Sequence, residues 1–214
     1  MTNTYLENHS LKLENTFGID IKCRYFIEVD SVEQLKSVLK EKVSPSIFIL
    51  SGGSNILFTQ DYPGLVIKIN IKGKQVEKVE GKHVFVKVQA GESWHEFVLW
   101  TIENGWGGLE NLSLIPGSCG AAPMQNIGAY GVEIKDVFVR LEALHRDSLE
   151  VHTFNHESCH FGYRESVFKR ELKDQYIIIS IVYRLHSEPK FNTSYGAIEE
   201  ELDKMGVVEK SLKS

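Results

Sequence analysis

Three features are scarce or absent in this 214-residue sequence: cysteines, long apolar runs and clusters of basic residues. The three cysteines, Cys23, Cys119 and Cys159, are an odd number at wide spacing, which argues against a disulfide framework and for a reducing cytoplasm. No segment approaches the roughly 18 apolar residues that a membrane span needs, so we expect no membrane partner. A formal net charge of −5 without a basic run makes nucleic acid a poor partner. The first ten residues, MTNTYLENHS, lack the charged and apolar regions of a signal peptide.

Hydrophobic periodicity indicates alternating strands and helices. Two capping boxes are expected, Ser31 with Gln34 and Ser93 with Glu96, and Gly105 can end the second helix in a left-handed conformation. The third helix has apolar residues at spacing i, i+4, i+7, namely Ile198, Leu202 and Met205. The predicted strands are 23–29, 46–50, 65–69, 83–89, 136–144 and 176–185, and the predicted helices are 31–42, 93–105 and 197–205. This order predicts two α/β lobes with a boundary near residue 73.

The segment SGGSN (51–55) directly follows a predicted buried strand. Gly52 and Gly53 allow positive φ and close approach of a ligand, and Ser54 and Asn55 add neutral donors. Successive N–H groups in such a turn form an anion-binding site that suits a pyrophosphate. An ordinary turn between strands is the alternative. The segment is neither a Walker loop nor G-x-G-x-x-G, so a Rossmann fold has no support.

The segment SLIPGSCGAAPMQNIGAYG (113–131) combines many small residues with no charged residue. Gln125, Asn126 and Tyr130 alternate with Gly128 and Gly131, an arrangement that a flexible linker does not need. Small residues let the backbone pack against a planar or anionic group, which amides and main-chain N–H groups then bind without added charge. The pattern predicts a site for a flavin or a dinucleotide. The cysteine within it is interpreted as a small filler, because no basic residue lies within ten positions.

FGYRES (161–166) places Tyr163 beside Arg164. The planar guanidinium of an arginine binds carboxylates and phosphates through two parallel hydrogen bonds. A surface pair of Arg164 with Glu165 is the alternative interpretation. HTFNHESCH (152–160) contains three histidines and a cysteine, but their spacing fits no common zinc site, and we expect no metal.

Several of these segments together resemble the UDP-N-acetylenolpyruvoylglucosamine reductase family. The matching pieces are NHSLKLENTFGI (8–19), SGGSNILF (51–58), AGESWHEFV (90–98), GLENLSLIPGSCGAAPMQNIGAYGVEI (108–134) and FGYRESVFK (161–169). They occur in the family's order and cover nearly the whole chain. The resemblance implies an α+β fold, the two-lobed FAD-binding domain of the vanillyl-alcohol-oxidase type. Its expected segments are a first lobe (1–72), a second lobe (73–190) and the start of a substrate-domain region (191–214).

The resemblance also implies an activity. NADPH would deliver a hydride to non-covalently bound FAD, which would pass it to the enolpyruvyl group of a UDP-sugar, giving UDP-N-acetylmuramate for peptidoglycan, cell-wall biogenesis, cell shape and cell division. Arg164 matches the arginine that stabilises negative charge on the substrate carboxylate, and Tyr163 and Tyr195 fall in the substrate region. We expect a monomer. The implied cofactor-binding residues are Gly52, Gly53, Ser54, Asn55, Ile56, Pro116, Gly117, Ala121, Ala122, Gln125, Asn126, Gly128, Ala129, Tyr130 and Gly131.

The sequence departs from the family's pattern in two places. Residues 120–123 read GAAP where some members have Gly-Ser-Ser-Pro, so any hydroxyl contact to FAD there is lost or replaced by backbone. The G-N-A-G-S-F-F-K-N-P stretch that carries the proton-donating serine is absent, as is the catalytic glutamate. The chain is therefore expected to be a fragment that is inactive or impaired alone. A flavin-binding module without catalysis and a flavin oxidase with covalent FAD remain alternatives, the oxidase disfavoured because SGGSN has no neighbouring histidine.

Overall fold

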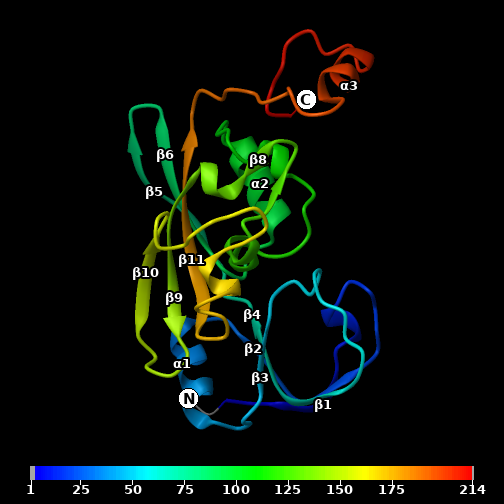
Figure 1. Ribbon diagram of the computed structural model, residues 1–214, viewed down its shortest axis with the longest axis vertical. Helices are drawn as coiled ribbons and strands as arrows, with labels where there is room; N and C mark the ends of the chain where they lie inside the picture. Colours follow the sequence, from blue (N-terminus) through cyan, green and yellow to red (C-terminus); the bar gives the residue numbers. More distant parts are fainter. Residues whose placement is uncertain (1–2, 214) are drawn as a thin grey trace.

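Two β-sheets follow one another along the long axis of the molecule (Figure 1). The computed structural model describes residues 3–213, so the ends of the predicted segments at 1–2 and 214 lie outside the described residues. The first sheet is built from residues 6–69 and the second from residues 74–186. The chain passes from one sheet to the other between Ile69 and Lys74, close to the boundary expected near residue 73. The division into separate lobes stays a prediction.

The first sheet is mixed, with strand order β1-β2-β4-β3. Strand β1 pairs antiparallel with β2, while β4 runs parallel to both β2 and β3. The central strand β4 is mostly apolar and buried, as expected for a strand covered on both faces, whereas its neighbour β2 alternates buried and exposed residues. The elements are β1 (Leu6–Ser10), the 3₁₀ turn η1 (Lys12–Glu14), β2 (Lys22–Val29), helix α1 (Val32–Glu41), β3 (Ile47–Leu50) and β4 (Tyr62–Ile69).

Helix α1 begins at a serine cap, as predicted. The N–H of Gln34 donates to Oγ of Ser31 at 3.3 Å. The side chain of Gln34 reaches back one residue further than expected, because its Oε1 accepts from the N–H of Asp30 at 3.0 Å. Leu35, Val38 and Leu39 form the buried face of the helix.

The second sheet is antiparallel throughout, with strand order β10-β9-β11-β6-β5. Three of its strands were predicted, and the two edge strands, β5 and β10, were not. The edge strands are polar and largely exposed, so they carry little hydrophobic signal. The strands are β5 (Lys74–Glu80), β6 (His83–Gln89), β9 (Phe138–His145), β10 (Val151–Asn155) and β11 (Tyr176–His186).

Helix α2 (Trp94–Glu103) and a series of short turns cover one face of the second sheet (Figure 1). The cap is the predicted one, since Oγ of Ser93 accepts from the N–H of Glu96, and Gly105 follows the helix with φ +76°. The sequence 113–131 folds here as a 3₁₀ segment and a small hairpin. The remaining elements are η2 (Glu110–Leu112), η3 (Cys119–Gln125), β7 (Gly128–Ala129), β8 (Val132–Glu133), η4 (Ile134–Asp136) and η5 (Val167–Lys169).

Helix α1 packs in a core to which both sheets contribute. Leu65 and Ile67 of the first sheet and Leu144, Ile177 and Ile179 of the second belong to the same buried cluster. A second, larger cluster lies under α2, and a third fills the opposite face of the first sheet. The shared cluster fixes the sheets relative to each other, because burying apolar surface between them stabilises one arrangement.

The last helix, α3 (Ile198–Lys204), is shorter than predicted, and its apolar face lacks one of the predicted residues. Leu202 is buried, but Met205 follows the helix and is 70% exposed. Within residues 3–213, the structure has no helix of the length and apolar character that crossing a bilayer demands.

Candidate functional site

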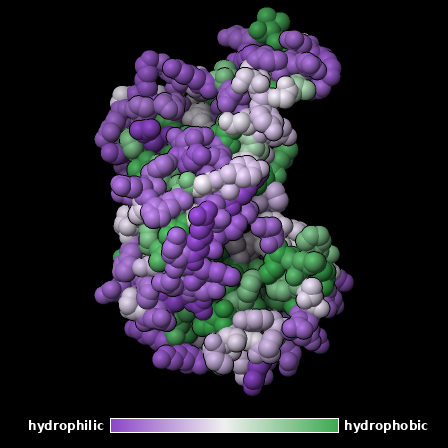
Figure 2. Space-filling view, viewed as in Figure 1, coloured by the Kyte–Doolittle hydropathy of each residue, from purple (hydrophilic) through white to green (hydrophobic). Residues whose placement is uncertain are grey.

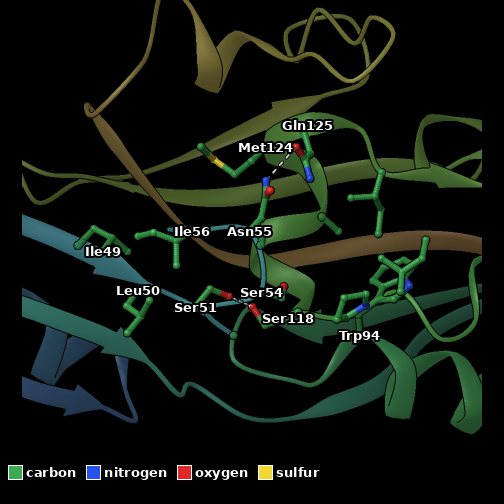
Figure 3. Close-up of a pocket in the computed structure, with 18 of the residues that line it drawn as sticks. Ile49, Leu50, Ser51, Ser54, Asn55, Ile56, Trp94, Ser118, Met124 and Gln125 are labelled. Atoms are coloured by element: carbon green, nitrogen blue, oxygen red, sulfur yellow. Dashed lines mark hydrogen bonds between the residues drawn. The ribbon is translucent and has the colours of Figure 1, made fainter. Parts of the chain in front are cut away.

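A cavity of about 620 Å³ lies between the end of β3 and the 115–127 segment, which covers the second sheet (Figure 3). Such a volume is typical of small-molecule sites. The SGGSN loop forms one wall, and the η3 segment forms the other. The first and second sheets therefore both contribute to the site.

Glycine backbones face each other within this cavity. A Cβ added to Gly52 would lie 2.9 Å from the Cα of Gly117. Gly117 has φ +116°, and a Cβ there would lie 3.2 Å from Oγ of Ser54. The two main chains thus approach each other without side chains between them, an arrangement that suits binding of an anion by main-chain N–H groups.

Two side-chain hydrogen bonds join the walls (Figure 3). The hydroxyls of Ser51 and Ser118 are hydrogen bonded to each other. Nδ2 of Asn55 donates to Oε1 of Gln125 at 3.3 Å. All four side chains are neutral, so they offer donors and acceptors without placing a fixed charge beside a ligand.

A second cavity of about 410 Å³ adjoins the first. It shares Ile49, Ser51, Ser118 and Met124 with the first cavity. Its further aliphatic lining comes from both sheets and includes Ile69, Ala90, Ile177 and Ile178. A long ligand can therefore extend from one cavity into the other.

The charges around the cavities are mainly positive, although the chain as a whole is acidic. Arg164 and Lys169 are the charged residues in the lining of the first cavity. The second is lined by Lys169, Arg146 and Lys173, with Asp174 as its one acidic residue. This distribution favours an anionic ligand.

Arg164 is positioned by main-chain groups. Its Nη2 donates to the carbonyl oxygen of Gly128 at 2.7 Å, and the carbonyl oxygen of Arg164 accepts from Nζ of Lys169 at 3.0 Å. Its φ is +55°, an uncommon value for a residue with a side chain. The alternative of a surface pair with Glu165 is wrong, because Glu165 pairs with Arg170 at 3.2 Å.

The structure places the sequence-predicted residues in two groups. Those that line the first cavity are Gly52, Gly53, Ser54, Asn55, Ile56, Pro116, Gly117, Ala121, Ala122, Gln125 and Arg164. Those that line neither cavity are Asn126, Gly128, Ala129, Tyr130, Gly131, Tyr163 and Tyr195.

Asn126 shows why part of the predicted set lies outside the cavities. It is fully buried, and its Nδ2 donates to the carbonyl oxygen of Gly162 at 2.9 Å while its Oδ1 accepts from the N–H of Lys135 at 3.2 Å. Its amide therefore joins two neighbouring loops. Tyr163, which follows Gly162, is 86% exposed.

Tyr130 and Tyr195 pack edge to face outside the cavities, with ring centroids 6.2 Å apart. A residue not singled out from the sequence holds the two segments together. Nδ2 of Asn111 donates to the carbonyl oxygens of Tyr130 at 3.1 Å and Asn192 at 2.8 Å. The segment after β11 is thus anchored against the turn at 129–131.

Sequence reasoning also missed several residues that line the first cavity, among them Trp94, Ile115, Met124 and Lys169. Trp94 is 1% exposed, and its Nε1 donates to the carbonyl oxygen of Leu112 at 2.8 Å. It lies within the AGESWHEFV segment, which already stood out by resemblance, so that match could have suggested it. Burial raises the pKa of the Cys119 thiol well above its usual value, which agrees with a role as filler.

Comparison with known proteins identifies what this arrangement is related to. A family model described as FAD binding domain matches residues 23–153. The chain belongs to the FAD-binding domain family. The UDP-N-acetylenolpyruvoylglucosamine reductase of Flavobacterium johnsoniae is 55% identical over 207 residues, which are 96% of this chain and 61% of that protein. The resemblance drawn from the sequence motifs is confirmed, and the chain spans about three fifths of the length of the curated relative it matches.

Solved structures give the same fold. The reductase MurB from Thermus caldophilus superposes with a TM-score of 0.68 at 24% identity, covering 96% of this chain and 67% of that one. A VAO-type flavoprotein from Myceliophthora thermophila superposes with a TM-score of 0.55 at 17% identity, covering 77% and 32%. The predicted α+β fold of the vanillyl-alcohol-oxidase type is confirmed.

Proposed function

We propose that the chain binds FAD non-covalently across the two adjoining cavities. The diphosphate would lie against the main chains of Gly52, Gly53 and Gly117, where successive N–H groups and no side chains are available. Ser54 and Asn55 would add neutral donors. Neither cavity has a histidine or cysteine among its described lining residues, which favours non-covalent attachment.

The two ends of FAD differ in what they need. The adenine needs an apolar, flat environment, which the aliphatic walls of the second cavity provide through Ile69, Ile177 and Ile178. The flavin would occupy the first cavity, which contains Trp94 and Arg164. The cationic residues around both cavities would offset the charge of the diphosphate.

We further propose that the bound flavin serves the reduction of UDP-N-acetylglucosamine enolpyruvate, with NADPH as the reductant, in cytoplasmic peptidoglycan synthesis. The name and 55% identity of the curated relative support this reaction. When bound, FAD supplies an acceptor and donor of hydride. The UDP-sugar would be the partner molecule of a monomeric chain.

Arg164 is the residue that we expect to act on the substrate. A guanidinium held by the carbonyl oxygen of Gly128 keeps further N–H groups free for a carboxylate. Its attraction would strengthen as negative charge develops on that carboxylate, which is the condition for accelerating a reaction. Tyr163 and Tyr195 are exposed and would contact substrate from outside the flavin cavity.

Slow or absent turnover by this chain alone is part of the proposal. Its support is the absence from the sequence of the G-N-A-G-S-F-F-K-N-P stretch with the family's proton-donating serine. The catalytically inactive flavin-binding module therefore stays the alternative. It predicts flavin binding with no product.

One experiment tests the cofactor and the reaction separately. An absorption spectrum of the purified chain, before and after denaturation, should show a flavin band that is released as free FAD. A chain that stays colourless with added FAD would contradict the cofactor assignment. NADPH and UDP-N-acetylglucosamine enolpyruvate are then added to the yellow protein. UDP-N-acetylmuramate formed at a rate typical of complete enzymes would contradict the expected impairment.

A further inference from the structure

The loop between β1 and β2, residues 11–21, has no role in the site described so far. Within this loop, Asn15 is only 7% exposed, and both its amide nitrogen and its amide oxygen are hydrogen bonded. Nδ2 donates to the carbonyl oxygens of Leu11 at 2.6 Å and Ile19 at 3.0 Å, and Oδ1 accepts from the N–H of Ile19 at 3.1 Å. One side chain thus closes the loop by hydrogen bonding both of its ends.

Hydrophobic packing does little to hold the middle of this loop. Leu13 is 92% exposed and Phe17 is 64% exposed. Figure 2 shows apolar side chains gathered on the surface where Figure 1 has this loop and the loop after β3. Leu11 and Ile21 anchor the two ends in the core, so the conformation of the middle depends on polar contacts, and the Asn15 amide provides three of them.

The loop rests directly on the candidate diphosphate-binding loop. The N–H of Thr16 donates to the carbonyl oxygen of Gly53 at 3.2 Å. A Cβ added to Gly53 would lie 2.0 Å from the carbonyl oxygen of Glu14, so the two backbones are in contact. Because the C=O and N–H of a trans peptide point in opposite directions, this bond turns the N–H of Ser54 away from the 11–21 loop. Ser54 is a residue that lines the cavity.

An ion pair attaches the same loop to the first sheet. Oε2 of Glu14 lies 2.9 Å from Nζ of Lys68 on β4, and Glu28 lies 3.2 Å from the same nitrogen. Burial lowers the pKa of Lys68, but the hydrogen bonds that it donates to Glu14 and Glu28 outweigh burial and raise the pKa overall. The lysine therefore stays charged at neutral pH, and the loop is fixed to the sheet on one side and to Gly53 on the other.

We propose that Asn15 is a positioning residue for the anion-binding loop, acting through the main chain of Glu14 and Thr16 on Gly53. This inference rests on the proposed function, because the ligand it affects is the diphosphate of FAD. Without the Asn15 amide, the 11–21 loop would lose its closed conformation. Gly53 and Ser54 would then sample orientations in which fewer N–H groups face the cavity, and FAD would bind more weakly.

The test compares the wild type with Asn15→Ala and with a matched control, Asn104→Ala. Asn104 is exposed and makes one comparable bond, from Nδ2 to the carbonyl oxygen of Trp100 at 2.8 Å, far from this loop in sequence. FAD is titrated with flavin fluorescence as the readout. We expect Asn15→Ala to raise the Kd about tenfold or more, equivalent to about 1.4 kcal/mol, and the control to leave it unchanged. Equal affinity of wild type and Asn15→Ala would overturn the proposal.

Two further readouts separate positioning from a general loss of stability. The ³¹P resonances of bound FAD should shift in Asn15→Ala and not in the control, because general destabilisation does not change the environment of the bound phosphates. Hydrogen exchange of the FAD-free chain should accelerate at 51–55 in Asn15→Ala. Unchanged exchange at 51–55 would overturn the proposal about Asn15. Failure of the wild type to bind FAD would reject the proposed function, and the exchange measurement would still test the role of Asn15.

A milder variant covers the case in which Asn15→Ala does not fold. Asn15→Ser keeps a neutral hydroxyl, which can donate one hydrogen bond in place of the two that Nδ2 donates to Leu11 and Ile19. It should give an effect in the same direction, with circular dichroism of the wild-type form. Wild-type affinity together with wild-type exchange at 51–55 in this variant would contradict the inference.

Discussion

The hydroxyls of Ser51 and Ser118 are hydrogen bonded to each other, although the two residues lie beside different sheets of the molecule. Ser51 follows β3 of the first sheet, and Ser118 precedes the η3 segment that covers the second. Both residues line both cavities. The pair thus marks the place where the two halves of the chain meet and where a ligand would pass from one cavity to the other.

Ser118→Ala should lower the free energy of unfolding by about 1 kcal/mol, because a side-chain hydrogen bond in a largely buried position contributes about that much. Ser51→Ala in the same background should cost little more, since the partner hydroxyl is already absent. Urea denaturation of the two single variants and the double variant measures this coupling. Ser148→Ala is the control, because its exposed hydroxyl only accepts from the N–H of Glu150 at 3.4 Å. Fully additive effects would show that the pair does not act as a unit.

Gly53→Ala should abolish detectable FAD binding, while Gly81→Ala should not affect it. Both glycines have φ near +60°, with +64° for Gly53 and +59° for Gly81. Only Gly53 is crowded, since its added Cβ would lie 2.0 Å from the carbonyl oxygen of Glu14, whereas Gly81 has nothing within 4 Å. The backbone strain of about 1–2 kcal/mol is common to both variants, so the difference isolates the contact. Flavin titration and thermal unfolding of each variant test this prediction. Equal affinity of the two variants for FAD would contradict it.

Much of the fold could be predicted because its signals are local. A segment of about ten residues is enough to identify the caps at Ser31 and Ser93 and the apolar faces of α1 and α2. The missed strands of the two larger sheets, β1, β5 and β10, are sheet edges whose side chains mostly face solvent. Pairing with a neighbouring strand fixes their position, and the local sequence pattern carries no information about that pairing.

The candidate site was predictable where the main chain itself carries the signal, as in Gly52, Gly53 and Gly117. The site was less predictable at residues whose side-chain direction depends on the tertiary structure. Asn126 has φ +42° and is buried against another loop, although its residue type suggested a ligand contact. Lys169 enters the cavity from a segment distant in sequence, and only tertiary structure shows that.

Replacing Arg164 by methionine should lower the free energy of unfolding by about 1.5 kcal/mol, the low end of the range for hydrogen bonds that involve a charged group, because its bond to Gly128 is only partly buried. The carbonyl oxygen of Gly128 would lose its partner at 2.7 Å, and the adjacent hairpin would loosen. Arg170→Met is the matched control. Its guanidinium pairs with Glu165 at the surface, 59% exposed, and such pairs contribute less than about 1 kcal/mol.

Urea denaturation of both arginine variants at neutral pH gives the comparison. The absorption spectrum of bound FAD adds a second readout, since the loosened hairpin borders the proposed flavin cavity. We expect a changed spectrum for Arg164→Met and a wild-type spectrum for Arg170→Met. Equal loss of stability in the two variants would show that the bond to Gly128 has no special weight.

Alkaline conditions should destabilise the chain through its buried thiols. Burial raises the pKa of Cys159 to about 12, and burial raises the pKa of Cys23 to about 11, from an ordinary value of 9.0. The folded state therefore favours the protonated thiol. This contribution to stability is fully present below pH 9, where the thiols of the unfolded chain are also protonated, and is lost as the pH rises from 9 toward the folded-state values.

Cys159→Ala should make that decline less steep. Between pH 9 and 10, one such thiol contributes a slope approaching about 1.4 kcal/mol per pH unit, and the variant lacks this contribution. Val98→Ala is the control, because it removes apolar volume at a fully buried, non-titrating position. It should lower the free energy of unfolding equally at every pH and keep the wild-type slope. Urea denaturation from pH 7.5 to 10 measures both slopes, and an unchanged slope in Cys159→Ala would show that this thiol ionises in the folded chain as readily as in the unfolded one.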